Sequence, residues 1–290
     1  MRHWYCTFVT LGALAAPVAA QVSPPRGFAA APDVQVRLVN LVGLVRVVGW
    51  DRDSVAVGGA LPPDAGELVM RGTRDALMIG VERRAGSEGY AGATLEVRVP
   101  RGVRLMIKAV HASLSISGVV GDIDAGLAKG RLQIEGAPRS IVAETITGNI
   151  ECDGPARSLR LRSLSGDIIV RGSAGDLAAT TVTGRLSIGG ALLRHVRLES
   201  TAGTIDVKGR LATDGLLDVQ THSGDIALRL PPTVSASLEA SADAGRFRTD
   251  FPGVRTRLAR GTPLKQTLGG GRGTIRVRTF TGVLELHQQP

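Results

Sequence analysis

The sequence is poor in aromatic residues, in cysteine and in long apolar segments. Only 3% of its 290 residues are Phe, Trp or Tyr, and it contains two cysteines. So few rings argue against a core built on large aromatic side chains and favour thin, regular layers of Val, Ile, Leu and Ala. Beyond residue 20, no apolar segment reaches the roughly 20 residues that a membrane-spanning helix needs. We therefore expect no transmembrane segment in the mature chain.

The first twenty residues contain the three parts of an export signal. A short positive start at Arg2 is followed by an apolar stretch, and Val18-Ala19-Ala20 supplies small residues at the cleavage positions. The apolar stretch is too short for a retained membrane anchor and is interrupted by Pro17. The sequence thus predicts a signal peptide at 1–20 and an exported protein, which is periplasmic, outer-surface-associated or secreted.

The chain is basic, with 35 Lys and Arg against 26 Asp and Glu and a formal net charge of +9 at pH 7. A basic balance favours anionic partners such as envelope polysaccharide, lipopolysaccharide or DNA. The sequence has no dense basic run with interleaved aromatics, which is the pattern typical of nucleic-acid binding. We therefore expect no nucleic-acid partner and interpret most arginines as solvated side chains on strand faces.

Glycine is abundant, at 38 residues, and six glycines recur at nearly constant spacing. Each begins the pattern Gly, any, apolar, any, apolar, as in Gly166-Asp-Ile-Ile-Val170. The steps between them are 18, 18, 18, 19 and 21 residues, and the positions are Gly130, Gly148, Gly166, Gly184, Gly203 and Gly224. A second apolar pair precedes each glycine, such as Leu159 and Leu161, so each unit holds two short strands.

This period predicts an all-β fold, a parallel β-helix or β-solenoid with coils of about 18 residues stacked about 4.8 Å apart. A sandwich of β-hairpins is the alternative, but sandwich loops have no reason to keep equal lengths. The predicted organisation is a linker at 21–32, an irregular β capping region at 33–104 and the solenoid at 105–290. Its last part includes a closing pair of strands around Gly282. The period is compatible with either handedness.

The repeated residues have structural explanations. We expect the glycines to adopt positive φ at tight corners rather than to bind phosphate, because no helix follows them. A hydroxyl three residues before five of the glycines is expected to hydrogen bond to the backbone at a corner, in the column Thr145, Ser163, Thr181, Ser200 and Thr221. Cys152 shares the register of Val170 and is predicted to be buried. As the one cysteine after the signal, it excludes an internal disulfide.

The Ser165-Gly-Asp-Ile168 and Ser223-Gly-Asp-Ile226 repeats, the early Gly49-Trp50-Asp51 segment and the closing strands resemble the bacterial putative-adhesin family. The resemblance covers nearly the whole mature chain. It implies an exported β-helical domain of unknown function at the cell envelope. It supplies no catalytic or binding residues to carry over, because the shared motifs are structural turns.

A group of carboxylates is the first candidate site. Glu135 and Asp153 are 18 residues apart and should stack one coil apart, with Glu151 on the strand of Asp153. Two carboxylates about 5 Å apart could share a proton in polysaccharide cleavage or hold Ca²⁺. Arg171 follows in the same column, however, and cross-strand charge pairing is the simpler explanation.

A group of arginines, Arg157, Arg160 and Arg162, is the second candidate site and would bind anionic glycans. The scattered histidines show no metal-ligand spacing, so we predict no metal, no cofactor and no catalytic residue. The sequence predicts a non-enzymatic exported β-solenoid, a structural or adhesin-like interaction module at the cell envelope. Its expected partners are envelope polysaccharide or another envelope protein. A carbohydrate-active enzyme or an anionic-glycan-binding module is the alternative.

The predicted inward register has a direct test. Ile168→Asp should place an unpaired charge inside the stack and lower the free energy of unfolding by several kcal/mol, as measured by urea denaturation. An unchanged free energy of unfolding would mean that Ile168 points outward.

Overall fold

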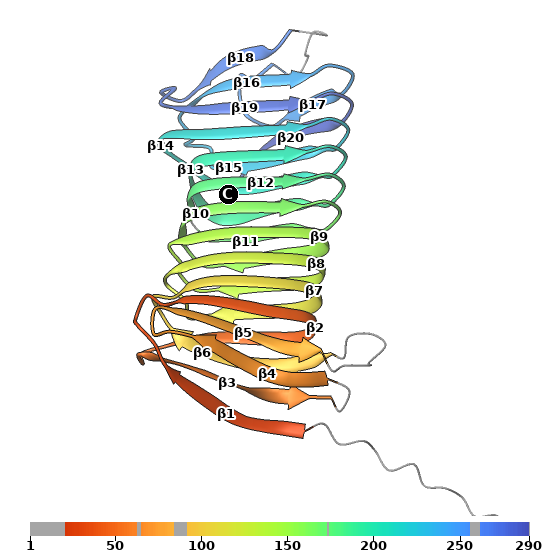
Figure 1. The fold of residues 1–290 in the computed structure, drawn as a ribbon. Helices are drawn as coiled ribbons and strands as arrows, with labels where there is room; N and C mark the ends of the chain where they lie inside the picture. The colour runs from red at the N-terminus through yellow and green to blue at the C-terminus, as the bar shows by residue number, and fades with distance from the viewer. Residues whose placement is uncertain (1–20, 63–64, 84–91, 173, 256–261, 290) are drawn as a thin grey trace, which may run out of the picture.

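The computed structural model describes residues 21–62, 65–83, 92–172, 174–255 and 262–289. These described residues form strands and no helix (Figure 1). The predicted all-β class is confirmed. Within the described ranges, no helix is long and apolar enough to cross a membrane. The predicted signal peptide at 1–20 lies outside the described residues.

The strands follow the predicted alternation of apolar and polar residues. In chain order they are β1 (Gln21–Ala29), β2 (Gln35–Trp50), β3 (Ser54–Leu61), β4 (Ala65–Gly72), β5 (Ala76–Arg83), β6 (Ala93–Pro100), β7 (Arg104–Ser117), β8 (Asp122–Glu135), β9 (Ser140–Asp153), β10 (Ala156–Ser163), β11 (Ile168–Arg171), β12 (Ala174–Thr181), β13 (Leu186–Ser200), β14 (Ile205–Thr221), β15 (Ile226–Leu230), β16 (Ala236–Ala242), β17 (Arg246–Thr249), β18 (Leu264–Leu268), β19 (Gly273–Thr279) and β20 (Val283–Gln288).

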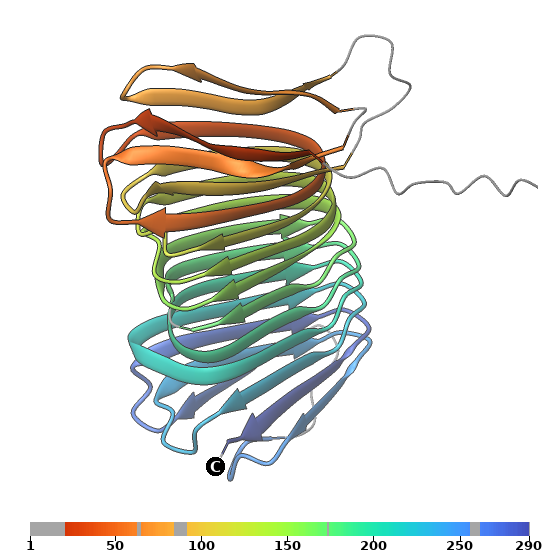
Figure 2. The same cartoon turned by 90° about the horizontal axis from the view of Figure 1, so that it is seen from below.

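The strands stack in parallel into a solenoid with two sheets joined at a curved corner (Figures 1 and 2). Sheet 1 contains β10 and β12, and sheet 2 contains β11; the long strands β7, β8, β9, β13 and β14 contribute one half to each sheet. From β7 to β12, residues paired across neighbouring strands are 18 positions apart, as in Asp122 with Ser140. Between His195 and Leu216 the step is 21, and the added residues include Asp214, which has φ of 61°.

The core lies between the two sheets and consists of one apolar column per inward position. Leu159 and Leu161 from sheet 1 and Ile168 and Val170 from sheet 2 are at most 2% exposed. Cys152 belongs to the column of Val170 and is also 2% exposed, as its register predicts. Because equivalent residues stack directly, each slot accepts a similar small volume, which explains the shortage of aromatic residues.

The N-terminal end differs from the predicted organisation. Residues 21–32, predicted as a linker, include β1, which pairs antiparallel with β3. Within the predicted capping region, β2 is a full coil whose two halves pair in parallel with β7 on one side and with β5 and β6 on the other (Figure 1). The antiparallel strands β1, β3 and β4 then cover this end of the stack. Antiparallel strands interrupt the parallel stacking of the coils, and they cover the strand edge to which a further coil could pair.

At the C-terminal end, as at the N-terminal end, a coil lies between strands that are distant from it in the sequence. Strands β19 and β20, predicted as the closing pair, lie inside the stack (Figure 1). They pair with β14 and β15 on one side and with β16 and β17 on the other. The outermost strand on sheet 1 is β18, which pairs antiparallel with β16. The last coil in sequence is therefore not the last coil in space.

The corner glycines are required by close approach rather than by positive φ. Gly130 has φ of 133°, but positive φ is not found at Gly148, Gly166 or Gly184, which corrects the predicted conformation. A Cβ atom on Gly166 would lie 2.0 Å from the carbonyl oxygen of Gly148, and one on Gly184 would lie 2.0 Å from that of Gly166. The coils are too close at this corner for any side chain.

Asp167 and Asp225, the acidic residues of the repeated Ser-Gly-Asp-Ile motif, hold one coil to the next. The carboxylate of Asp167 accepts a hydrogen bond from the backbone N–H of Arg185 at 2.8 Å. Asp225 accepts one from the N–H of Val283 at 2.7 Å. These bonds satisfy backbone donors where the strands of sheet 2 begin.

The close approach of the coils predicts a strong dependence on glycine. Gly184→Ala should lower the free energy of unfolding by about 1–3 kcal/mol, the usual cost of overpacking. Gly189→Ala is the matched control, because a Cβ atom there would have no neighbour within 4 Å. Urea denaturation of both variants measures the difference, and equal stability of the two would contradict the corner geometry.

Candidate functional site

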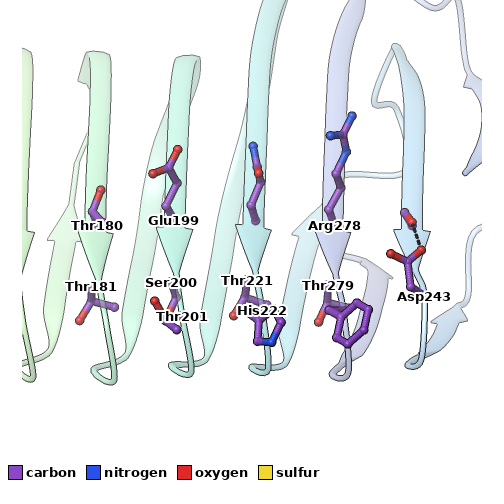
Figure 3. A pocket seen from close by; sticks show the side chains of 13 residues that line it. Thr180, Thr181, Glu199, Ser200, Thr201, Thr221, His222, Asp243, Arg278 and Thr279 are labelled. Carbon is purple, nitrogen blue, oxygen red and sulfur yellow. Dashed lines mark hydrogen bonds between the residues drawn. The ribbon is translucent and has the colours of Figure 1, made fainter. Parts of the chain in front are cut away.

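A groove of about 470 Å³ lies along the corner of sheet 1 near the C-terminal coils. Its lining residues come from β12, β13, β14, β19 and β16 and from the turns that follow them (Figure 3). They are Thr180, Thr181, Glu199, Ser200, Thr201, Gln220, Thr221, His222, Ser241, Asp243, Arg278, Thr279 and Phe280. The groove therefore crosses five neighbouring coils.

The base of the groove is the hydroxyl column that the sequence predicts. Thr181, Thr221 and Thr279 are buried in one row across neighbouring strands (Figure 3). The N–H of Gly224 donates to the hydroxyl of Thr221 at 3.1 Å, and that of Gly282 donates to the hydroxyl of Thr279 at 3.0 Å. The hydrogen bonds of Thr221 and Thr279 join these hydroxyls to the backbone, so the column has a structural role.

Thr279 also donates to the carbonyl oxygen of Gly224 at 3.1 Å, although the two residues are 55 positions apart. The hydroxyl column predicted from the sequence ends at Thr221, because the coil of Thr279 follows an interruption of the period. The sequence does contain the pattern there, since Thr279 precedes Gly282 by three residues, as a hydroxyl residue does in the other coils of the column.

The wall of the groove is a second row of polar side chains on sheet 1. Thr180 pairs with Glu199, Glu199 with Gln220, and Gln220 with Arg278 in adjacent strands (Figure 3). Glu199 accepts a hydrogen bond from Arg197 at 2.7 Å, and Arg278 lies 3.6 Å from Glu239. The charged members of the wall are thus compensated by neighbours outside the groove.

The rim of the groove carries an aromatic pair. The rings of His222 and Phe280 are stacked, with centroids 5.1 Å apart and planes inclined by 8°. They occupy the turn directly after the hydroxyls of Thr221 and Thr279, which are paired in adjacent strands. Phe280 is 47% exposed although its ring is large and apolar.

The predicted carboxylate patch lies on sheet 2, away from the groove. Asp153 accepts a hydrogen bond from Arg171 at 2.9 Å, and Glu151 lies within 3.9 Å of both Arg131 and Arg171. Glu135 accepts a hydrogen bond from the Gln133 amide at 2.7 Å. The stacking predicted from the 18-residue step is present, and so is the predicted pairing of Asp153 with Arg171.

The predicted arginine patch lies on β10 in sheet 1, where Arg157, Arg160 and Arg162 are exposed. Arg162 is in register with Thr180 at one end of the groove and lies 3.9 Å from Glu144. Among the described residues, no ion pair is made by Arg157 or Arg160. The described ranges also contain no cluster of His, Cys, Asp and Glu that could hold a metal ion.

The fold and the groove define a β-solenoid with a polar, aromatic-rimmed surface site. Residues 72–285 match the model of the Toastrack DUF4097 family, and the chain belongs to this family. This agrees with the predicted resemblance to the putative-adhesin family, which the structural likenesses below confirm.

Two solved structures share the fold. One is a putative adhesin from Parabacteroides distasonis ATCC 8503, with a TM-score of 0.53 and 10% identity over 94% of this chain and 98% of that chain. The other is a putative adhesin from Parabacteroides merdae ATCC 43184, with a TM-score of 0.53 and 10% identity over 93% of this chain and 97% of that chain. At such low identity the likeness concerns the fold alone. No curated protein matches the sequence.

The buried thiol offers a test of the packing. Burial raises the pKa of Cys152 to about 12, with a smaller contribution from the charge of Asp153. In a Cys6→Ser chain, where Cys152 is the only cysteine, a thiol reagent at pH 8 should label the native protein very slowly. It should label the urea-unfolded protein rapidly, because the thiol then returns to a pKa of about 8.5. Fast labelling of the native chain, with a Cys152→Ser blank, would contradict the burial.

Proposed function

We propose that this chain is a non-enzymatic, exported module that binds other molecules at the bacterial cell envelope, as an adhesin does. It is built on coils of about 18 residues, and the two solved structures described above are putative adhesins. The predicted signal peptide at 1–20 would direct it out of the cytoplasm. The observation that carries the proposal is a long stacked surface on which carboxylates such as Asp153, Glu135 and Glu199 are held by arginine or glutamine side chains.

The charged side chains of both sheets are arranged in cross-strand pairs rather than for acid–base catalysis. A general acid at neutral pH needs a raised pKa. Among the described residues, a shift is resolved for two carboxyl groups, and both are lowered. The hydrogen bond from Arg139 lowers the pKa of Asp122, and the backbone N–H of Gln288 lowers that of Asp250. Such carboxylates accept hydrogen bonds and stay ionised.

The alternative of a carbohydrate-active enzyme would use Glu135, Glu151 and Asp153. Arg171 donates a hydrogen bond to Asp153 at 2.9 Å and lies 3.9 Å from Glu151, so both carboxylates are already paired with a cation. Glu135, which the 18-residue step places beside Asp153, accepts its hydrogen bond from the Gln133 amide at 2.7 Å. These contacts support a binding module over a hydrolase.

The proposal predicts binding without turnover. The full chain, expressed with its own leader, should be recovered outside the cytoplasm and should sediment with isolated cell envelopes. Incubation with envelope polysaccharides should release no reducing ends. The triple variant Glu135→Gln, Glu151→Gln, Asp153→Asn should sediment equally well, because these residues lie on sheet 2 and take no part in the groove.

Release of reducing ends by the unchanged chain, lost in the triple variant, would establish the enzyme instead. Absence from the envelope fraction and failure to sediment would overturn the binding module.

A further inference from the structure

The exposed aromatic pair is unusual for this molecule, in which only 3% of residues are aromatic. Ile146 and Leu164 occupy the same turn position in earlier coils, directly after a hydroxyl residue, and are 53% and 52% exposed. At the groove this position carries His222 and Phe280, stacked on each other. The flat ring of Phe280 thus stands at the rim, where a ligand in the groove would meet it.

The groove offers a regular series of hydrogen-bonding side chains. Thr180, Glu199, Gln220, Arg278 and Ser241 occupy one register position on five neighbouring strands. Four steps of about 4.8 Å make this row roughly 19 Å long. The row supplies hydroxyl, carboxylate, amide and guanidinium groups, hence both donors and acceptors. A ligand with hydroxyls repeating along an extended chain matches this series.

The charges in the groove disfavour a polyanion. Glu199 and Asp243 are carboxylates, and Arg278 is the one permanent cation among the lining residues. Arg278 is already within 3.6 Å of Glu239, and Asp243 accepts a hydrogen bond from Ser241 at 2.9 Å. Without excess positive charge, the groove gains little from phosphate, sulfate or uronate groups.

An extended peptide is also disfavoured, because its usual mode of binding adds a strand to a free sheet edge. Each strand that lines the groove is paired on both sides. For example, β14 lies between β13 and β19, and β16 lies between β19 and β18. The backbone therefore has no free edge here, and side chains must provide recognition.

We propose that the groove binds an extended, uncharged hexose polysaccharide, with one sugar ring stacked on Phe280 and the hydroxyls of its neighbours bonded to the Glu199–Gln220–Arg278 row. The C–H groups on one face of a pyranose ring form an apolar patch, and the negative face of an aromatic ring attracts them. The rise from coil to coil is close to the length of one sugar unit. This inference rests on the proposed function and names the class of ligand for it.

The experiment is titration calorimetry of the full chain with uncharged hexaoses of β-1,4-, β-1,3- and α-1,4-linked glucose. We expect saturable binding of at least one, insensitive to salt. Phe280→Ala should weaken it about tenfold, which corresponds to about 1.4 kcal/mol. Phe280→Tyr should retain it, because the ring face is preserved. Leu164→Ala is the matched control, since it removes a similarly exposed side chain at the same turn position outside the groove.

Each outcome decides the question. No binding of any hexaose by a chain that still sediments with envelopes would overturn the inference and leave the proposed function standing. Loss of hexaose binding together with loss of sedimentation with envelopes would overturn this inference and the proposed function. Binding that Phe280→Ala and Leu164→Ala weaken equally, with unfolding midpoints unchanged, would place the sugar elsewhere. Binding only to acidic polysaccharides, lost at high salt, would assign recognition to exposed arginines such as Arg157 and Arg160 instead.

Discussion

The structure depends on the parallel hydrogen-bonded stacking of coils at the spacing of a β-sheet. Because each strand pairs with the same register positions of its neighbours, every residue becomes part of a column that runs along the solenoid. Apolar columns fill the interior and hydroxyls occupy the corner. Gly148, Gly166 and Gly184 follow where the carbonyl of the preceding coil leaves no room for Cβ. The low aromatic content and the near-constant period are both consequences of this one constraint.

At each end of the solenoid, the coil that comes first or last in the sequence lies inside the stack. β2 is enclosed by β5, β6 and β7, while β19 and β20 are enclosed by β14 to β17. Antiparallel strands then cover the N-terminal end of the stack and the sheet 1 side of its C-terminal end, where a regular parallel coil would present an unpaired edge. This arrangement also creates the groove, because it places Phe280 beside His222, 58 positions away in the sequence.

The two broad sheets and the corner differ in how they meet solvent. On the sheets, charges from neighbouring coils pair with each other, as Asp153 does with Arg171 and Asp206 does with Arg229. Exposed pairs of this kind contribute little stability. At the corner, the turn residues Ile146, Leu164 and Phe280 are about half exposed, and Phe280 is stacked on His222. This exposed aromatic pair supports our proposal that recognition takes place at the corner, over the hydroxyl column.

Much of the fold was determined by the sequence alone, because a period of 18 residues with two alternating strands has few solutions. It identified the inward residues such as Ile168 and Val170, the hydroxyl column from Thr145 to Thr221, the buried Cys152 and the pairing of Asp153 with Arg171. It missed the strand at Gln21–Ala29, whose prolines suggested a linker. The insertion of β2 and β19 was decided only by the tertiary structure, because nothing in a local pattern states which coil a strand will join. The groove was likewise decided only by the tertiary structure. His222 and Phe280 are ordinary turn residues in the sequence, and they form a site because coils distant in sequence stack side by side.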